Sequence, residues 1–210
     1  MIVQAPSETL NLNLSAEHEA LRAAVRDFAR KEIAPIAAQF DESGEFPYDT
    51  IKKMGAMGLM GIEVPEEYGG AGMDTVAYVL AMEEISKVDA SCSVIMSVNN
   101  SLVCWGLEQY GTEEQKQKYL PRLCSGEIIG AFALSEPEAG SDATSQRTTA
   151  EDMGDHYLLN GTKNWITNGT TASVYLVIAQ THPELKSRGI NVLIVDKDMP
   201  GFIQGPKENK

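Results

Sequence analysis

Apolar side chains recur with the period of an α-helix along the first part of the chain, up to about residue 125. Leu21, Val25 and Phe28 follow one another at intervals of four and three residues, which places them on one helical face. Ser15 stands where an N-cap side chain would accept a backbone hydrogen bond. Pro35 is expected to end or kink the helix, because proline has no N–H to donate. The pattern therefore predicts an amphipathic helix that begins just after Ser15.

Further helices are predicted in the same part of the chain. Residues 49–57 form a predicted helix after Pro47, whereas residues 58–74 are rich in Gly and Pro and indicate a loop. Residues 73–81 repeat an apolar face, and residues 94–105 are apolar nearly all round, as expected of a buried helix. This half of the chain is therefore predicted to be all-helical.

Asn99 and Asn100 interrupt the predicted buried helix. A buried amide needs hydrogen-bond partners, so the pair either makes polar contacts inside the core or contacts a ligand. The core interpretation is favoured, because most buried polar groups are structural.

The pattern changes after Gly126. Short runs rich in β-branched and aromatic residues, bounded by Gly, Asn, Asp and Pro, are typical of strands. These runs are residues 128–134, 156–159, 174–180 and 190–195. Asn160-Gly161 is the preferred pair for a two-residue type I′ turn, so a hairpin is predicted that leads into a strand at residues 162–167. The sequence thus predicts an α+β chain, with a helical domain at residues 1–127 and a barrel-like β-domain at residues 128–210.

The formal net charge of −13 narrows the possible partners. Such a charge repels polyanions at long range, so nucleic-acid binding is not expected. An acidic protein can still bind an anionic cofactor, if backbone N–H groups and hydroxyls solvate the phosphates. A nucleotide ligand therefore remains compatible with the composition.

The cysteines, the N-terminus and the hydropathy bear on location. The spacing of the three cysteines, Cys92, Cys104 and Cys124, fits neither a metal site nor a disulfide scaffold. The three histidines, His18, His156 and His182, are not spaced as metal ligands either. The N-terminal residues lack the patterns of signal and transit peptides. No apolar run approaches the ~20 residues needed to span a bilayer. We therefore expect a cytoplasmic protein with no membrane span and no metal site.

The loop SEPEAGSD, residues 135–142, is the first candidate for chemistry, because GxGxxG, GxxxxGK[ST], HExxH and GxSxG sites are all lacking. It directly follows an apolar strand. Ser135 and Ser141 offer neutral donors there, and Gly140 would permit an unusual φ and the close approach of a ligand phosphate. By composition alone the loop is as typical of a surface turn as of a binding site.

Trp165 and Thr167 form the second candidate. If they lie on the strand predicted after the hairpin, their side chains point to one face. An aromatic surface beside a hydroxyl suits an isoalloxazine ring, which stacks through its face and accepts hydrogen bonds at its ring nitrogens. A tryptophan in a strand is nevertheless more often part of a core.

Together these two segments resemble the acyl-CoA dehydrogenase family, and the resemblance covers nearly the whole chain. Residues 82–102 and 109–127 are similar to the N-terminal helical domain of that family. Residues 132–142, 160–169 and 189–201 are similar to its middle β-domain. The short-chain, butyryl-CoA type is nearest, on the strength of SVNNSL, FALSEP and GTKNWITN.

The resemblance implies that two segments bind FAD. The implied cofactor-binding residues are Phe132, Ala133, Leu134, Ser135, Gly140, Ser141, Trp165, Ile166 and Thr167. Trp165 would pack on the flavin, the Thr167 hydroxyl would approach N5, and Ser135 would lie near the polar edge of the flavin. Ser141 would serve the phosphate region and the acyl-CoA substrate. Glu138 replaces a Gly or Asn common in the family, so its carboxylate is expected to point to solvent, away from phosphates.

The implied reaction converts a short- or medium-chain acyl-CoA to the trans-2-enoyl-CoA and passes electrons to an electron-transfer flavoprotein. It needs a carboxylate to remove the α-proton. In the family this base is a glutamate of a C-terminal helical domain in a homotetramer, and the chain is expected to stop at Lys210 inside the β-domain, before that base. Glu136 lies near the expected flavin site but is a poor candidate for this base, because a structural role in the turn explains its presence better. No catalytic residue is therefore predicted.

The 210-residue chain is accordingly expected to be inactive. It is also expected to be poorly soluble, because an incomplete β-domain exposes unpaired strand edges and apolar surface. Two alternatives remain open: an acyl-CoA oxidase that hands electrons to oxygen, and a non-catalytic module that binds flavin, CoA or a protein partner.

Overall fold

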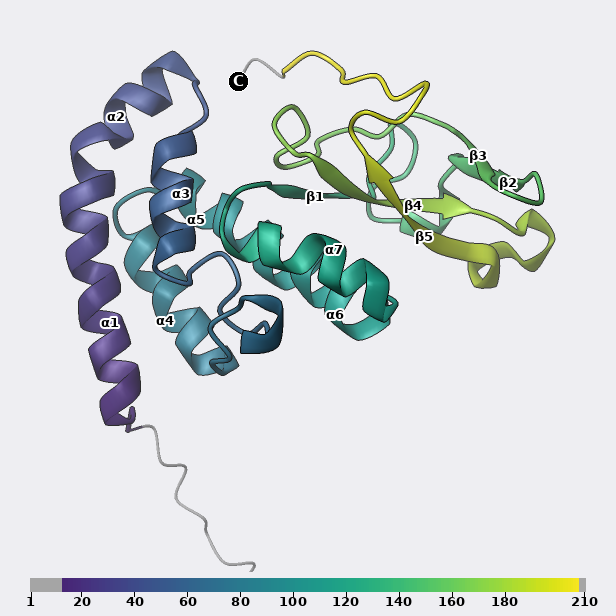
Figure 1. Cartoon of the computed structure of the whole chain (residues 1–210). Helices are drawn as coiled ribbons and strands as arrows, with labels where there is room; N and C mark the ends of the chain where they lie inside the picture. Colours follow the sequence, from purple (N-terminus) through teal and green to yellow (C-terminus); the bar gives the residue numbers. More distant parts are fainter. Residues whose placement is uncertain (1–12, 208–210) are drawn as a thin grey trace, which may run out of the picture.

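The computed structural model describes residues 13–207, in which a bundle of helices packs against a small β-sheet (Figure 1). The long helical elements are α1 (Ala16–Phe28), α2 (Ala34–Ser43), α3 (Tyr48–Ala56), α4 (Thr75–Ser86), α5 (Ala90–Ser97), α6 (Trp105–Tyr110) and α7 (Glu113–Cys124). Among the described residues, the π-helical segments are η1 (Ala29–Ile33) and η3 (Val98–Cys104), and the 3₁₀ segments are η2 (Glu66–Tyr68), η4 (Ala143–Ser145) and η5 (Pro183–Gly189). The strands are β1 (Gly130–Ala133), β2 (Thr149–Asp152), β3 (Tyr157–Asn160), β4 (Val174–Gln180) and β5 (Ile190–Asp196).

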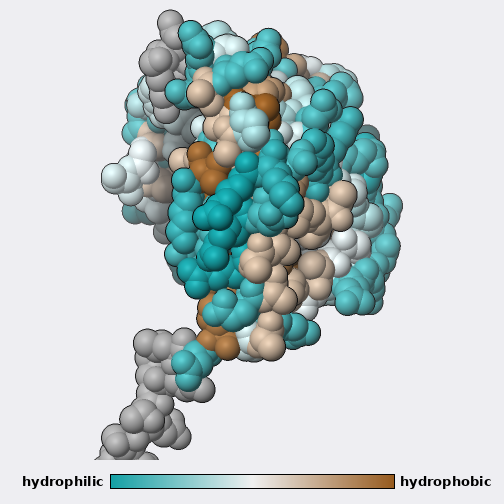
Figure 2. Space-filling model, turned by 90° about the vertical axis from the view of Figure 1, so that its left-hand side faces the viewer, coloured by the Kyte–Doolittle hydropathy of each residue, from teal (hydrophilic) through white to brown (hydrophobic). Residues whose placement is uncertain are grey.

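The outer helix α1 begins where the sequence predicts. The Ser15 hydroxyl accepts a hydrogen bond from the N–H of His18, 3.1 Å away. The interruption expected at Pro35 takes the form of the π-helical turn η1, so Pro35 falls in the first turn of α2, where its missing N–H costs little. α2 ends at Gly44, which adopts φ 64°. The face shown in Figure 2 is mostly hydrophilic, as expected of helices on the outside of a bundle.

The side-chain amide of Asn99 joins the helices to the sheet. Its Nδ2 donates to the carbonyls of Met60 (2.8 Å) and Leu123 (3.3 Å), and its Oδ1 accepts from the N–H of Gly130 (3.1 Å), the first residue of β1. Asn99 lies in the π-helical turn η3 and its side chain is fully buried. The loop at residue 60, the helical segment that contains Asn99 and the chain from the end of α7 to the start of β1 thus meet at one amide.

Asn100 makes a similar set of bonds inside the helical core. Its Oδ1 accepts from the N–H of Ile62 (2.8 Å), and its Nδ2 donates to the carbonyls of Leu59 and Met96 (both 2.9 Å). Both asparagines therefore satisfy protein backbone groups. The core interpretation of this pair is confirmed, and the ligand interpretation is wrong.

Residues Ala90–Tyr110 correct the expectation that no segment is long and apolar enough to span a bilayer. α5, η3 and α6 run on without a break, so this 21-residue helix has the length and mean hydropathy, 1.2, of a candidate span. Half of it is buried inside the protein. Core helices of soluble proteins share this composition, so the helix by itself is weak evidence for a membrane.

Strand β4 is the centre of the sheet. It pairs in parallel with β1, with Gly130 opposite Val174, and antiparallel with β5 along its whole length. β2 joins the end of β4 through Thr149 and Gln180, and β2 pairs antiparallel with β3. β4 is buried along nearly its whole length, because the helices cover one of its faces and the loops cover the other.

The prediction of a hairpin turn at Asn160-Gly161 is wrong. β3 pairs with residues 149–152, a strand that the sequence analysis missed, and the turn of this hairpin lies at residues 153–156. Residues 161–173 form no strand. Gly161 serves close packing instead, because a Cβ there would lie 2.3 Å from the Thr148 hydroxyl oxygen.

A shared apolar core ties the two halves together. Side chains of η3, α6 and α7 pack with side chains of β4 in one buried cluster, and α6 and α7 accordingly lie between the outer helices and the sheet (Figure 1). The cluster includes Val103, Leu107, Leu120, Val174 and Leu176. The position of β1 and β4 is therefore set by helix packing as well as by the sheet.

Substitution of Asn99 by alanine should lower the free energy of unfolding by about 3 kcal/mol, because it leaves buried carbonyl and N–H groups without partners. Urea denaturation followed by circular dichroism measures this. Gln109, exposed on α6, provides the control variant Gln109→Ala. A loss below about 1 kcal/mol for Asn99→Ala would show that the junction matters little.

Glu84 is a buried carboxylate surrounded by cationic side chains. Only 2% of its side chain is exposed, and it accepts hydrogen bonds from Arg26 (2.9 Å), Arg22 (3.0 Å) and Lys87 (3.1 Å). Hydrogen bonds from Arg26 above all outweigh desolvation and hold the pKa of Glu84 far below its ordinary value of 4.5. The stabilisation is therefore complete above pH 4.5 and is lost as the pH falls below it.

Glu84→Gln should destabilise the protein by about 3 kcal/mol at pH 7 and flatten the fall in stability below pH 4.5. The matched control is Glu83→Gln, since the Glu83 side chain is 45% exposed and contacts the same Lys87. Chemical denaturation between pH 3 and 7 measures both. If stability depended on pH in the same way in both variants, the acid sensitivity would not come from Glu84.

Candidate cofactor-binding site

The two segments singled out in the sequence lie side by side in the structure. The N–H of Asn164 donates to the carbonyl of Ser135 (2.9 Å), and the Lys163 ammonium donates to the carbonyl of Leu134 (2.9 Å). Farther along, the Asn168 side chain donates to the carbonyl of Gly130 (3.1 Å). Residues 163–168 therefore follow β1 and the loop after it, although about 30 residues separate the two segments.

The predicted residues differ in their exposure. Phe132 and Ala133 end strand β1, half-buried and buried respectively. Leu134 and Ser135 are half-buried beyond the strand, as are Ile166 and Thr167 in the second segment. The exposed members are Gly140, Ser141 and Trp165. The hydroxyl-bearing and aromatic residues thus reach a surface, as binding of a ligand requires.

The loop after β1 forms a tight turn. The N–H of Glu136 donates to the carbonyl of Ala139 (3.0 Å), and the reverse bond is 3.2 Å. The unusual φ expected of Gly140 is not found, since its φ lies outside the left-handed region. A Cβ at Gly140 would meet nothing within 4 Å, so the protein leaves open space there.

Trp165 adopts a strained backbone conformation. Its φ is 59°, a region that bulky L-residues rarely enter, and its side chain is 65% exposed. Asn168 also has a positive φ, 63°. The expectation that Trp165 and Thr167 project from one face of a strand is therefore wrong, because residues 161–173 turn repeatedly. Strain at an exposed aromatic residue is typical of a functional site.

Glu136 lies beneath the turn, with only 2% of its side chain exposed. Its carboxylate accepts hydrogen bonds from the N–H groups of Arg147 (2.5 Å) and Thr148 (3.1 Å) and from the Lys163 ammonium (2.7 Å). Burial raises its pKa, but these hydrogen bonds outweigh burial and lower the pKa to about 2. A carboxylate so stabilised is a poor proton acceptor, which excludes Glu136 as a base.

The other two carboxylates of the loop face solvent or local partners. Glu138 is half-exposed and lies 3.5 Å from the exposed Arg147 guanidinium, as expected of a carboxylate directed away from a phosphate. Asp142 accepts from the hydroxyls of Ser145 (2.5 Å) and Thr144 (2.8 Å), and these bonds lower its pKa. Asp142 therefore shapes the start of η4.

Sequence reasoning missed the residues that hold the second segment. Lys163, Asn164 and Asn168 carry its anchoring bonds; they lie within the GTKNWITN segment of the family resemblance, but no periodicity or chemistry gave them a role of their own. Lys163 offers one hint, since its flanks contain no other charged residue from Gly161 to Ser173.

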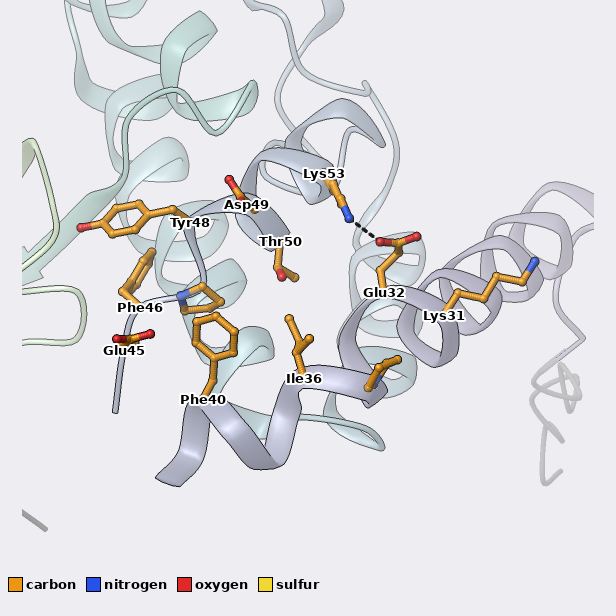
Figure 3. Close-up of a pocket in the computed structure, with 12 residues that line it drawn as sticks. Lys31, Glu32, Ile36, Phe40, Glu45, Phe46, Tyr48, Asp49, Thr50 and Lys53 are labelled. Atoms are coloured by element: carbon orange, nitrogen blue, oxygen red, sulfur yellow. Dashed lines mark hydrogen bonds and ion pairs between the residues drawn. The ribbon is translucent and has the colours of Figure 1, made fainter. Parts of the chain in front are cut away.

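Two other features of the described residues do not extend this site. A hollow of about 500 Å³ lies between α2 and α3 (Figure 3), but it is lined only by residues between 31 and 53 and so includes none of the predicted residues. Within residues 13–207, no three His, Cys, Asp or Glu side chains are placed to hold a metal ion.

The residue types brought together here suit a flat aromatic ligand with a polar edge. Trp165 carries an aromatic ring of the kind that stacks on such a ligand, and Thr167 and Ser135 carry hydroxyls of the kind that hydrogen-bond its edge. Ser141, beside the open space at Gly140, can approach a phosphate. The described residues therefore suit a flavin nucleotide, although none of them is placed as a base for substrate chemistry.

The chain is similar in sequence to curated acyl-CoA dehydrogenases. It is 52% identical over 199 residues to an acyl-CoA dehydrogenase of Bacillus subtilis, across 95% of this chain and 52% of the relative. It is 46% identical over 201 residues to the short-chain specific acyl-CoA dehydrogenase of Clostridium acetobutylicum, across 96% of this chain and 53% of the relative. The chain thus spans about half the length of the curated relatives it matches.

Solved structures of the same group share the fold. Butyryl-CoA dehydrogenase from Megasphaera elsdenii matches with a TM-score of 0.91 and 38% identity, across 96% of this chain and 54% of that one. A chain from a study of the electron transferring flavoprotein of Acidaminococcus fermentans matches with a TM-score of 0.93 and 44% identity, across 96% and 53%. A glutaryl-CoA dehydrogenase of Mycobacterium smegmatis in complex with FADH2 matches with a TM-score of 0.84 and 38% identity, across 90% and 47%.

Family models match nearly the whole chain. The N-terminal domain of acyl-CoA dehydrogenases matches residues 15–127, and the middle domain matches residues 131–210. Together with the relatives and the shared fold, these matches show that the chain belongs to the acyl-CoA dehydrogenase family.

Proposed function

We propose that this chain supplies the flavin-binding half of an FAD-dependent dehydrogenase that acts on short-chain acyl-CoA thioesters. The observation that carries the proposal is the contact between the 134–136 loop and the 163–168 segment, with a strained and exposed Trp165 beside Thr167. The identities to short-chain specific and butyryl-CoA enzymes support the substrate class.

Each residue of the site has a proposed role. Bound FAD would accept a hydride from the β-carbon of the acyl thioester. Trp165 would hold the face of the flavin, the hydroxyls of Thr167 and Ser135 would hydrogen-bond its polar edge, and Ser141 would contact phosphate and the CoA portion of the substrate. These residues would orient the cofactor and exclude water, without themselves moving a proton.

The base that removes the α-proton is proposed to lie outside the described residues. Glu136 lies in the loop between the predicted flavin-binding residues Ser135 and Gly140. Its carboxylate is buried, accepts three hydrogen bonds and has a lowered pKa. The resemblance supplies the alternative, a glutamate of a C-terminal helical domain. We further propose transfer of electrons to an electron-transfer flavoprotein, assembly as a homotetramer when that domain is present, and a cytoplasmic location.

The proposal predicts that the 210-residue chain does not turn over. Without a positioned base the α-proton stays in place, so butyryl-CoA added with FAD should not bleach the flavin absorbance under anaerobic conditions. Stopped-flow spectroscopy measures this, with a full-length short-chain acyl-CoA dehydrogenase as the positive control. Bleaching at a rate close to that of the control would refute the assignment of the base.

Trp165→Ala should weaken FAD binding about tenfold, because it removes an aromatic contact worth ~1–1.5 kcal/mol. Titration of FAD with protein, followed by flavin fluorescence, measures the change. Trp105→Ala is the matched control, since Trp105 is also exposed but lies on α6. Equal losses of affinity in the two variants would argue against a flavin contact at Trp165.

A further inference from the structure

We propose that Lys163, held by Glu136, is a positioning residue that fixes Trp165 and Thr167 beside the Ser135 loop. The inference rests on the proposed FAD site, because it states how the two halves of that site are kept in register.

Lys163 uses every donor that it has. Its ammonium donates to Glu136 Oε1 (2.7 Å), to the carbonyl of Leu134 (2.9 Å) and to Gln146 Oε1 (3.1 Å), and an ammonium carries three N–H groups. Its side chain is only 10% exposed. The bond to Leu134 joins the second segment directly to the first, one residue before Ser135.

Glu136 completes the arrangement from the other side. Its carboxylate is bound by the backbone N–H groups of Arg147 and Thr148, so it cannot swing away with the lysine. A buried charge left without its partner is strongly destabilising, whereas a fully bonded pair is tolerated. The pair therefore fixes three stretches of chain relative to one another, at residues 134–136, 146–148 and 163.

The second segment is held by contacts from its loop residues. Residues 161–173 belong to no strand, and the sheet ladder does not hold them. Lys163 and Asn164 anchor the segment on one side of Trp165, and Asn168 anchors it on the other. Between these anchors Ile166 packs against the buried cluster of the sheet, so Lys163 and Asn164 supply the anchoring bonds on the N-terminal side of Trp165.

Backbone strain makes these anchors necessary. The positive φ of Trp165 is unfavourable for a bulky L-residue and persists only where the surroundings enforce it, whereas Asn168 adopts such a φ more readily. Lys163 is two residues from Trp165. If its bonds are removed, the backbone of Trp165 is expected to relax toward a negative φ, which would turn its ring in another direction.

The test uses tryptophan fluorescence of the 210-residue chain without FAD. Trp105 and Trp165 are the two tryptophans, so a Trp105→Phe background makes Trp165 the sole reporter. In this background Lys163→Met should raise the acrylamide quenching constant of Trp165 by up to about half, because Trp165 is already 65% exposed and the released loop samples open conformations. The affinity for FAD should fall about tenfold or more, while the helical circular dichroism is retained.

Two further variants separate positioning from general stability. Lys163→Arg keeps the positive charge and can still donate to the Glu136 carboxylate, so it should show most of the wild-type quenching behaviour. Arg122→Met breaks an exposed ion pair with Glu127 (2.8 Å) on α7 and should leave Trp165 unchanged. Unchanged quenching in folded Lys163→Met would overturn the inference, as would an equal change in Arg122→Met.

Failure to fold is also decisive. If Lys163→Met does not fold, Glu136→Gln is measured instead, and an altered Trp165 signal in that variant supports the inference while an unaltered one overturns it. If neither variant folds, the pair is a general structural requirement and the inference is overturned. If the wild-type chain shows no FAD binding but Trp165 still responds to Lys163→Met, the proposed function fails and the positioning role stands.

Discussion

The protein depends on one buried amide, that of Asn99. It hydrogen-bonds the loop at Met60, the end of α7 at Leu123 and the start of β1 at Gly130, and so joins the helices to the sheet beside their shared apolar core. The π-helical turn η3 allows two consecutive asparagines to be buried, and Asn100 secures the neighbouring loop. Because β1 leads directly into the predicted flavin loop, the position of the site follows from this junction.

The site itself is built from loops whose position depends on electrostatics more than on the sheet. Although the chain carries a net charge of −13, several of its cations are used internally. Arg22 and Arg26 neutralise the buried Glu84, and Lys163 neutralises the buried Glu136. The first group holds α1 to α4, and the second holds the two flavin segments together. The cost of desolvating such buried ion pairs cancels much of their attraction, so they add little net stability. Their main contribution is to fix the relative positions of the segments that they join.

Much of the fold follows from the sequence by simple physical rules. The helical half, the change of pattern after Gly126, the N-cap at Ser15 and the long central strand are all visible in periodicity and capping. The segments FALSEPEAGSD and NGTKNWITNG carried the family resemblance, because their combination is far more specific than any single motif. The buried asparagines were also interpreted correctly, since a polar group inside an apolar helix must find partners.

Only the tertiary structure decided the rest. Asn160-Gly161 has the composition of a hairpin turn, yet β3 pairs backward with β2 and Gly161 is selected by contact with Thr148, a contact that no local pattern contains. The conformation of Trp165 and the burial of Lys163 likewise arise from bonds to residues about 30 positions away. The sequence by itself therefore determined the family to which the chain belongs and the two segments predicted to bind the flavin. Their geometry was decided by long-range packing, because loop conformations are set by contacts made between distant segments and not by local propensity.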